Sequence, residues 1–273
     1  MLQIMLRKVL RRILRPWVLP PTLEHFRRIR EDELQTAIGL LPPEGKLLEL
    51  GAGTGWQAKR LAEYGFEVSA VEVIPEAQGM MPAIYRKNQI YPIIDYDGHH
   101  LPFGNETFNI VFSSSVLEHI PHDRAFQKEI HRVLKQDGKV LHILPSATWR
   151  FCSTLTYFIR RLSRPDTGEI EWPSRHGEKG SLITEQYYFS RMAWKKFFRQ
   201  TGWEVERIAP NRLFYTGECI LDIALSCHAR KTLSYFFGSS CYLYVIRKRQ
   251  QPIEPEPNVS SGLKIKGNNA AAA

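Results

Sequence analysis

The sequence contains few cysteines and lacks the spacings that structural metal sites use. Four cysteines occur among 273 residues. None belongs to a C-x-x-C pair, and none stands at zinc-like spacing from a histidine. We therefore expect free, mostly buried thiols in a reducing compartment and no bound metal. The four residues are Cys152, Cys219, Cys227 and Cys241.

Long apolar runs and internal repeats are also missing. No apolar stretch reaches about 18 residues, so no segment is predicted to cross a membrane as a helix.

The length of the chain suits one sizeable domain with added segments. The composition is ordinary except for a formal net charge of +9. Much of this excess is local, because residues 1–30 hold eight Lys or Arg and the single acid Glu24.

A short glycine-rich stretch organises the chain. Residues 47–55 read as a buried strand that breaks into three glycines at alternate positions, and a helix-capable segment, Trp56–Tyr64, follows. A strand, turn and helix in this order build the nucleotide crevice of a doubly wound α/β sheet. The G-x-G-x-G spacing differs from that of dinucleotide binders and P-loops, and no Lys follows. We therefore do not expect a nucleoside triphosphate.

This stretch resembles motif I of the class I S-adenosylmethionine-dependent methyltransferases, specifically the type 11-like members. A glycine-rich turn by itself also fits a structural turn in another Rossmann-like protein, so the rest of the chain has to support the resemblance. The resemblance implies S-adenosylmethionine as the cofactor. It assigns cofactor contacts in this stretch to Glu49, Gly51, Ala52, Gly53, Thr54 and Gly55.

An acidic residue ends the second predicted strand. That strand covers Phe66–Glu72, and Glu72 stands 21 positions after Gly51. An acid about 20 residues beyond the turn is placed to accept hydrogen bonds from ribose hydroxyls. We therefore predict Glu72 as a ribose ligand, with Val73 beside it. A helix is expected from Pro75 to about residue 88, and then a short third strand at Ile90–Ile94.

A third motif follows that strand. Asp97–Phe103 resembles the "G-D-A-x-x-L-P-F" element of the family, in which the acid contacts the adenine amino group. Counting back from Leu101 selects Asp97, and Gly98 and His99 would then contact the adenine ring. The neighbouring His99 and His100 do not predict a metal site, because adjacent residues rarely bind one ion.

The fourth motif covers the fourth strand and the following helix. Phe108–Ser114 reads as a strand, and Val116–Ile120 leads into a helix that reaches Lys135. This block strongly resembles the family's "V-L-E-H-I" region, and Ser113 and Ser114 are predicted cofactor contacts at the strand end. The four motifs occur in the order that the family shows.

Beyond residue 145 the resemblance is architectural. A helix over Thr184–Gln200, a strand over Trp203–Ile208 and a strand over Cys241–Arg247 would complete a Rossmann-like, doubly wound seven-stranded α/β sheet with an antiparallel last strand. Two segments, residues 146–181 and 212–238, exceed this core. We expect them to add helices, such as the apolar run 219–225, on the acceptor side.

The first residues predict a basic amphipathic helix. Apolar residues recur at helical spacing over Met1–Trp17, and the opposite face carries Arg7, Lys8, Arg11, Arg12 and Arg15. Such a helix suits an anionic membrane interface. Two alternatives are packing of the apolar stripe on the domain and a targeting role. Pro16, Pro20 and Pro21 end the helix.

These observations predict three parts of the chain. Residues 1–21 form the arm, and residues 22–249 form the methyltransferase domain, with a cofactor half at 45–145 and an acceptor half at 146–249. Residues 250–273 are rich in Pro, Asn and Ala and are expected to be disordered. We expect a cytoplasmic protein that is peripheral on the membrane.

Three histidines are candidate general bases, in the order His176, His119 and His122, because imidazole titrates near neutrality. His176 lies within Trp172–Glu178, a cluster of an aromatic, a cation and a potential base. It is loosely similar to methyltransferases that modify saccharides or their lipid-linked precursors. A base matters only when the acceptor is a hydroxyl of high pKa, and no metal is required.

Three functions remain open. The first is methyl transfer to a small or lipid-linked acceptor at a membrane surface, with O-methylation of a saccharide, phenol or quinone favoured. The second is nucleic-acid methylation, suggested by the net charge. The sequence speaks against it, because the charge lies on an amphipathic arm and no N-P-P-Y-type element follows Phe108–Ser114. The third is a non-catalytic module that only binds cofactor. No oligomeric state is predicted.

Overall fold

The computed structural model describes residues 18–19, 23–73, 88–162, 174–216 and 224–250. Several predicted features lie outside these residues. They are the amphipathic arm over 1–17, the helix expected from Pro75, the Trp172 end of the candidate base cluster, most of the apolar run 219–225 and nearly all of the C-terminal tail.

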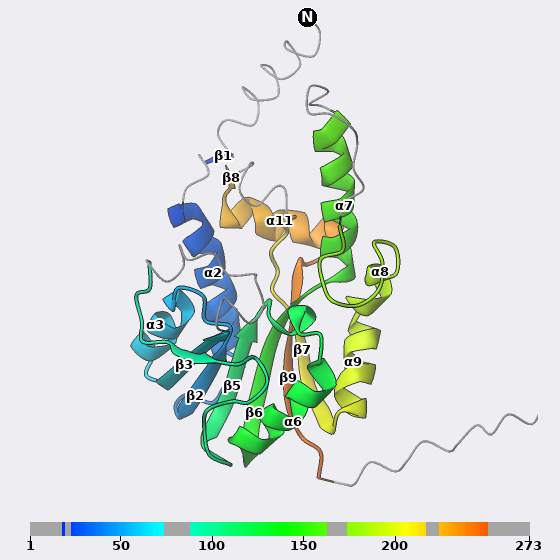
Figure 1. The fold of residues 1–273 in the computed structure, drawn as a ribbon. Coiled ribbons are helices and arrows are strands. Elements are labelled where there is room, and N and C mark those ends of the chain that lie inside the picture. The colour runs from blue at the N-terminus through cyan, green and yellow to red at the C-terminus, as the bar shows by residue number, and fades with distance from the viewer. Residues whose placement is uncertain (1–17, 20–22, 74–87, 163–173, 217–223, 251–273) are drawn as a thin grey trace, which may run out of the picture.

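A seven-stranded sheet forms the centre of the protein, with the strand order β4-β3-β2-β5-β6-β9-β7 (Figure 1). Strand β9 runs antiparallel to both of its neighbours, whereas the other paired strands are parallel. This confirms the predicted doubly wound sheet with an antiparallel last strand. The strands are β2 (Lys46–Leu50), β3 (Glu67–Val73), β4 (Ile94–Tyr96), β5 (Phe108–Ser114), β6 (Leu134–Pro145), β7 (Trp203–Pro210) and β9 (Cys241–Lys248).

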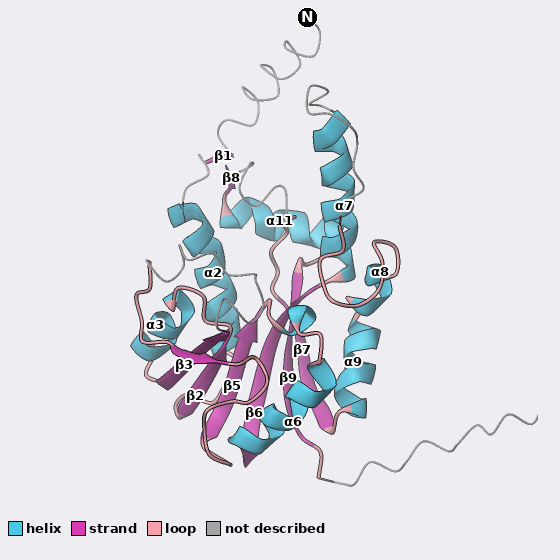
Figure 2. Cartoon of the chain, viewed as in Figure 1, coloured by secondary structure: helices cyan, strands magenta, loops and turns pink. Residues whose placement is uncertain are grey.

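Helices cover both faces of the sheet (Figure 2). Successive strand residues point to opposite faces, so neighbours such as Leu47 and Leu48 belong to two different apolar clusters. One face packs against α2 (Leu23–Ile38) and α3 (Trp56–Glu63), and the other packs against α6 (Asp123–Val133) and α9 (Arg191–Gln200). The result is a three-layer α/β/α arrangement.

The inserted segments stand beyond the carboxyl ends of the parallel strands (Figure 1). They supply α7 (Ala147–Leu162), α11 (Cys227–Phe237) and β8 (Ala224–Leu225), and β8 pairs antiparallel with β1 (Val18–Leu19) from the N-terminal part of the chain. Extra helices on the acceptor side were therefore predicted correctly. However, the described end of the apolar run 219–225 is a strand. Among the described residues, none of the helices has the length and apolarity needed to span a bilayer.

Some predicted boundaries were wrong. The helix expected over Thr184–Gln200 is two helices, α8 (Glu185–Tyr188) and α9. Ser190 separates them because its backbone is extended and its Oγ accepts a hydrogen bond from the N–H of Ala193 at 3.1 Å, which caps α9. The segment after β5 is likewise a single 3₁₀ turn, η1 (Leu117–His119), followed by the separate helix α6. Strand β4 begins at Ile94, the residue at which the third strand was expected to end.

Candidate functional site

The turn between β2 and α3 is built from the three glycines that the sequence singled out. Gly51, Gly53 and Gly55 all have positive φ, of 68°, 57° and 77°. The space around Gly51 and Gly55 is restricted as well. A Cβ on Gly51 would lie 2.4 Å from Cγ2 of Val116, and one on Gly55 would lie 2.7 Å from Cβ of Tyr91. Only glycine satisfies both demands.

Glu72 lies against this turn. Its Oε2 accepts a hydrogen bond from the backbone N–H of Gly53 at 2.8 Å, and its Oε1 accepts one from Val73 at 3.0 Å. The contact arises because β2 and β3 are paired in parallel, so the carboxyl end of β3 reaches the turn that leaves β2. The predicted ribose ligand is therefore a partly buried carboxylate at the glycine turn.

A buried acid lies below the turn. Glu49 is 1% exposed, and its Oε2 has no hydrogen-bond partner among the described residues. Burial, helped by the nearby negative charge of Glu72, raises the pKa of Glu49 to about 8. An unpartnered buried acceptor calls for an explanation, such as a group that is not part of the chain. Ser114 Oγ at the end of β5 is also buried without a partner.

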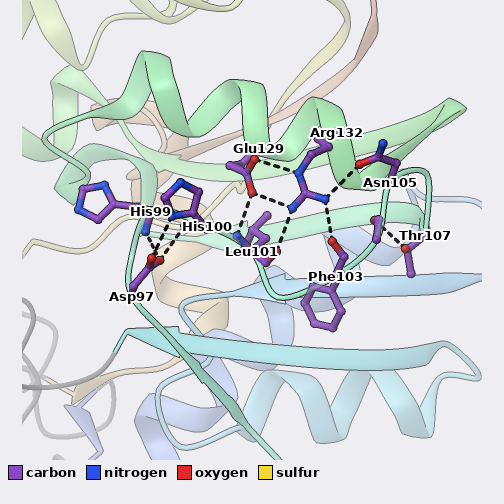
Figure 3. A network of polar contacts seen from close by, with 10 residues as sticks. Asp97, His99, His100, Leu101, Phe103, Asn105, Thr107, Glu129 and Arg132 are labelled. Carbon is purple, nitrogen blue, oxygen red and sulfur yellow. Dashed lines mark hydrogen bonds and ion pairs between the residues drawn. The ribbon is translucent and has the colours of Figure 1, made fainter.

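Asp97 organises the loop after β4 (Figure 3). Its Oδ1 accepts hydrogen bonds from the N–H groups of His99 and His100, each at 2.7 Å, and its Oδ2 lies 3.0 Å from Nδ1 of His100. These bonds, chiefly those from His100, hold the pKa of Asp97 well below its usual range. The predicted adenine ligand is thus an exposed carboxylate whose hydrogen bonds also stabilise the loop that carries it.

Two residues of α6 fasten the next part of this loop (Figure 3). Glu129 accepts a hydrogen bond from the N–H of Leu101 at 2.9 Å, while Arg132 donates to the carbonyls of Leu101 at 2.9 Å and Phe103 at 2.7 Å. The sequence analysis missed Glu129 and Arg132. The only signal was their presence in the family block, where nothing marks them as partners of the Leu-Pro-Phe element.

The three candidate bases occupy two places. His122 lies beside the Asp97 loop, where its Nε2 is 2.8 Å from the carbonyl oxygen of Gly98 and its ring stacks on His99 with centroids 4.1 Å apart. His119 and His176 instead meet each other, with ring centroids 4.7 Å apart. The chain therefore brings two of the three candidates together, and the third contacts the Asp97 loop.

Burial favours the neutral form of both neighbouring imidazoles. Burial, with smaller contributions from His119 and Arg150, lowers the pKa of His176 to about 4. Burial also lowers the pKa of His119. Aromatic rings enclose His176, since the ring of Trp149 lies 4.6 Å and that of Phe189 6.1 Å from its centroid. Neutral imidazoles in an aromatic setting can accept a proton or bind a metal ion.

A buried ion pair holds the segment that carries His176. Oε1 of Glu185 accepts hydrogen bonds from the N–H groups of His176 and Gly177, each at 2.7 Å, and Oε2 lies 2.6 Å from Nε of Arg150. Arg150 also donates to the carbonyl of Ser174 at 2.9 Å. Sequence reasoning missed both residues, because no motif distinguishes them from other charged residues of the acceptor half.

Ser113 takes a different position from Ser114. Its hydroxyl lies 2.7 Å from Nδ1 of His142 on the neighbouring strand β6, and both residues are almost fully buried. The Ser113 side chain is thus part of the sheet interior, and only its backbone is left for the predicted cofactor contact.

These residues fit S-adenosylmethionine. The glycine turn leaves room for close approach of a ligand, and carboxylates at the ends of β3 and β4 match ribose hydroxyls and an adenine amino group. The buried acceptors of Glu49 and Ser114 lie at the ends of the two central strands β2 and β5, which are paired in parallel. When bound there, the cofactor would supply an activated methyl group.

Comparison with known proteins agrees with this geometry. Residues 48–142 match the family described as a methyltransferase domain. An uncharacterized methyltransferase of Mycobacterium leprae is 34% identical over 102 residues, which are 37% of each chain. A demethylmenaquinone methyltransferase of Corynebacterium urealyticum is 37% identical over 100 residues, covering 37% of this chain and 41% of the relative. The alignments thus span less than half the length of these relatives.

The fold is also shared with solved structures. A SAM-dependent methyltransferase from Thermotoga maritima superposes with a TM-score of 0.51 at 18% identity, covering 83% of this chain and 93% of that one. The likeness extends through the acceptor half, beyond the segment that the family match covers. Motif order, strand order and these matches support a class I S-adenosylmethionine-dependent methyltransferase domain, which the family match places at residues 48–142.

Proposed function

We propose that the protein transfers the methyl group of S-adenosylmethionine to a hydroxyl of a small or lipid-linked acceptor at a membrane surface. The observation that carries this proposal is the pair of neutral imidazoles, His119 and His176, just beyond the end of β5. Strand β5 is paired in parallel with β2, so the pair lies at the same edge of the sheet as the glycine turn.

Methyl transfer from a sulfonium is an in-line displacement, and the protein mainly has to align the partners in a dry site. A hydroxyl acceptor must also lose its proton. An imidazole that is already neutral at pH 7 can accept it, and His176 is our first candidate, with His119 second. His122 remains third, since its Nε2 is already engaged by the Gly98 carbonyl.

An apolar acceptor suits the surroundings of this pair. Trp149 and Phe189 are almost fully buried beside His176. The demethylmenaquinone methyltransferase among the relatives supports an aromatic or quinone-like acceptor. Phenols, quinones and lipid-linked saccharides are therefore the acceptors to test first.

A group of exposed aromatic side chains supports the proposal that the protein acts at a membrane surface. Tyr235, Phe236 and Phe237 at the end of α11 are 85%, 80% and 54% exposed. Apolar side chains so exposed in one run favour contact with a membrane or another apolar surface. The net charge of +9 favours binding to a membrane that contains anionic lipid, through electrostatic attraction.

The test is calorimetric titration of the purified protein with S-adenosylhomocysteine, which requires no knowledge of the acceptor. We expect saturable binding with a dissociation constant of about 1 μM. Labelled methyl donor should then transfer its methyl group to one of the acceptor classes named above. Binding without transfer to any acceptor would favour the non-catalytic alternative, and transfer to DNA or RNA would favour the nucleic-acid alternative. Absence of binding at millimolar ligand would refute the proposal.

A further inference from the structure

One buried carboxylate, just beyond the end of β5, has no hydrogen-bond partner among the described residues. Glu118 is 5% exposed, and neither of its carboxylate oxygens has a hydrogen-bond partner among the described residues. Burying an ionised carboxylate is costly unless a cation or hydrogen bonds compensate it. Because such groups are rare in folded proteins, this one needs a physical explanation.

Two imidazoles face this carboxylate. One ligand atom each from Glu118, His119 and His176 can be chosen so that all three lie within 4.8 Å of one another. The closest ion-pair distance, from Nε2 of His119 to Oε1 of Glu118, is 3.9 Å. Nδ1 of His119 is also buried without a partner. The cluster thus holds three buried atoms without hydrogen-bond partners, two from Glu118 and one from His119.

The nearby cations are committed to other carboxylates. Arg30 is close enough to attract Glu118, but its NH1 group donates to Glu33 at 2.7 Å. Arg150 pairs with Glu185, as described above. Lys179 pairs with Asp123. Each of these carboxylates has its own cation, whereas Glu118 has none in direct contact among the described residues.

The backbone holds the three residues in place. The N–H of Glu178 donates to the carbonyl of Glu118 at 2.9 Å, so the segment that carries His176 is tied directly to η1. There is no room for a side chain at Gly177, whose added Cβ would lie 2.9 Å from the same carbonyl. Together with the grip of Glu185 on His176 and Gly177, these contacts preorganise the cluster.

We propose that Glu118, His119 and His176 bind a divalent transition-metal ion, such as Zn²⁺ or Co²⁺. Two imidazoles and one carboxylate are a donor set that these ions prefer. Three protein ligands leave a coordination position open, which a hydroxyl oxygen of the acceptor can fill. The imidazole nitrogens then serve as ligands instead of as the base, and the ion lowers the pKa of the acceptor hydroxyl so that its proton passes to solvent water. This inference rests on the proposed function and adds a metal to the same site.

The sequence predicted no metal here because its third ligand is distant. Glu118 and His119 are adjacent, which rarely suffices to bind one ion, and His176 belongs to a segment after α7. Only the fold brings it to the other two. The ligand atoms are farther apart than in a closed site, so the side chains have to move inward by a rotamer change when the ion binds.

The test uses the full chain, freed of any affinity tag and stripped with chelator. Co²⁺ is added while visible absorption is recorded, and Zn²⁺ binding is measured by calorimetry. We expect one ion per chain, bound with a dissociation constant of about 10 μM or tighter. H119A and H176A should each weaken binding by about tenfold or more, which corresponds to about 1.4 kcal/mol. H228A, which changes an exposed histidine on α11, should bind like the unchanged protein.

The inference is overturned by the absence of saturable Co²⁺ and Zn²⁺ binding, or by binding that survives in both H119A and H176A. Circular dichroism of the metal-free variants shows whether each is folded. His176→Ala is the more informative variant, because the backbone contacts of residue 176 to Glu185 do not depend on its side chain. S-adenosylhomocysteine titration in chelator is the separate check on the cofactor site. Cofactor binding without metal binding would refute this inference and leave the methyltransferase proposal intact.

Discussion

Arg150 and Glu185 form an ion pair with side chains only 6% and 0% exposed, and Nε and Oε2 lie 2.6 Å apart. The pair joins α7 to α8 and holds the segment that carries His176. A buried charge left without its partner costs about 3 kcal/mol or more. The position of His176 therefore depends on an interaction between the two helices that flank its segment in the chain.

Glu185→Gln should destabilise the protein by about 3 kcal/mol, because it leaves Arg150 buried without a counter-charge. Urea unfolding monitored by tryptophan fluorescence measures this change. Glu204→Gln is the matched control, since Glu204 pairs with Arg247 on the surface and exposed pairs contribute about 1 kcal/mol or less. Equal effects of the two substitutions would show that the Arg150–Glu185 pair does not hold the segment.

Glu72→Ala should weaken S-adenosylhomocysteine binding by about tenfold or more, which corresponds to about 1.4 kcal/mol. The reason is the loss of the carboxylate that lies at the glycine turn and is predicted to bind the ribose. Calorimetry measures the change. Glu67→Ala, at the exposed start of the same strand, is the control and should leave the affinity unaltered. An unchanged dissociation constant for Glu72→Ala would contradict its assignment.

Gly51→Ala should both destabilise the protein and abolish cofactor binding, because the new Cβ would lie 2.4 Å from Val116 in addition to the strain of a positive φ. Gly65→Ala separates the two causes. Gly65 also has a positive φ, of 99°, but a Cβ there would meet nothing within 4 Å. We expect it to cost about 1 kcal/mol and to retain cofactor affinity. Thermal denaturation and calorimetry of both variants test this difference.

Glu118 should make the metal-free protein less stable as pH rises. Burial raises the pKa of Glu118 to about 8, above its ordinary value of 4.5. Between pH 4.5 and pH 8 the folded protein keeps a proton on Glu118 that the unfolded chain releases. The stabilisation from this proton is therefore complete below pH 4.5, and it is lost as the pH rises through 8. In chelator, Glu118→Gln should therefore gain stability relative to the unchanged protein from pH 5 to pH 8. Parallel stability curves would contradict the raised pKa.

The membrane proposal predicts two separable effects. Deleting residues 1–15 should abolish flotation with anionic vesicles, because the deletion removes five of the Lys and Arg residues. Replacing both Tyr235 and Phe236 by Ser should weaken flotation by removing exposed apolar area. Neither change should alter the affinity for S-adenosylhomocysteine. Ile94→Ser, at a half-exposed position on β4, is the control. Flotation that survives both changes would exclude these contacts.

The sequence alone determined the cofactor half of the protein. The glycine turn and the acid at the end of β3 follow from local patterns of strand ends and turns, whereas the Asp97 loop and the block after β5 were predicted from the family resemblance. Local rules are sufficient there, because positive φ at a turn and alternation along a strand depend on near neighbours. The order of the strands followed from the family resemblance.

Tertiary structure decided the acceptor half. No spacing rule predicts that His176 meets His119 while His122 contacts the Asp97 loop, that Ser113 bonds to His142 within the sheet, or that Arg150 and Glu185 hold the segment between them in the chain. The packing of α7 and α8 brings Arg150 and Glu185 together, whereas the pairing of β5 with β6 places Ser113 beside His142. Their energies come from burial, which a linear pattern does not contain.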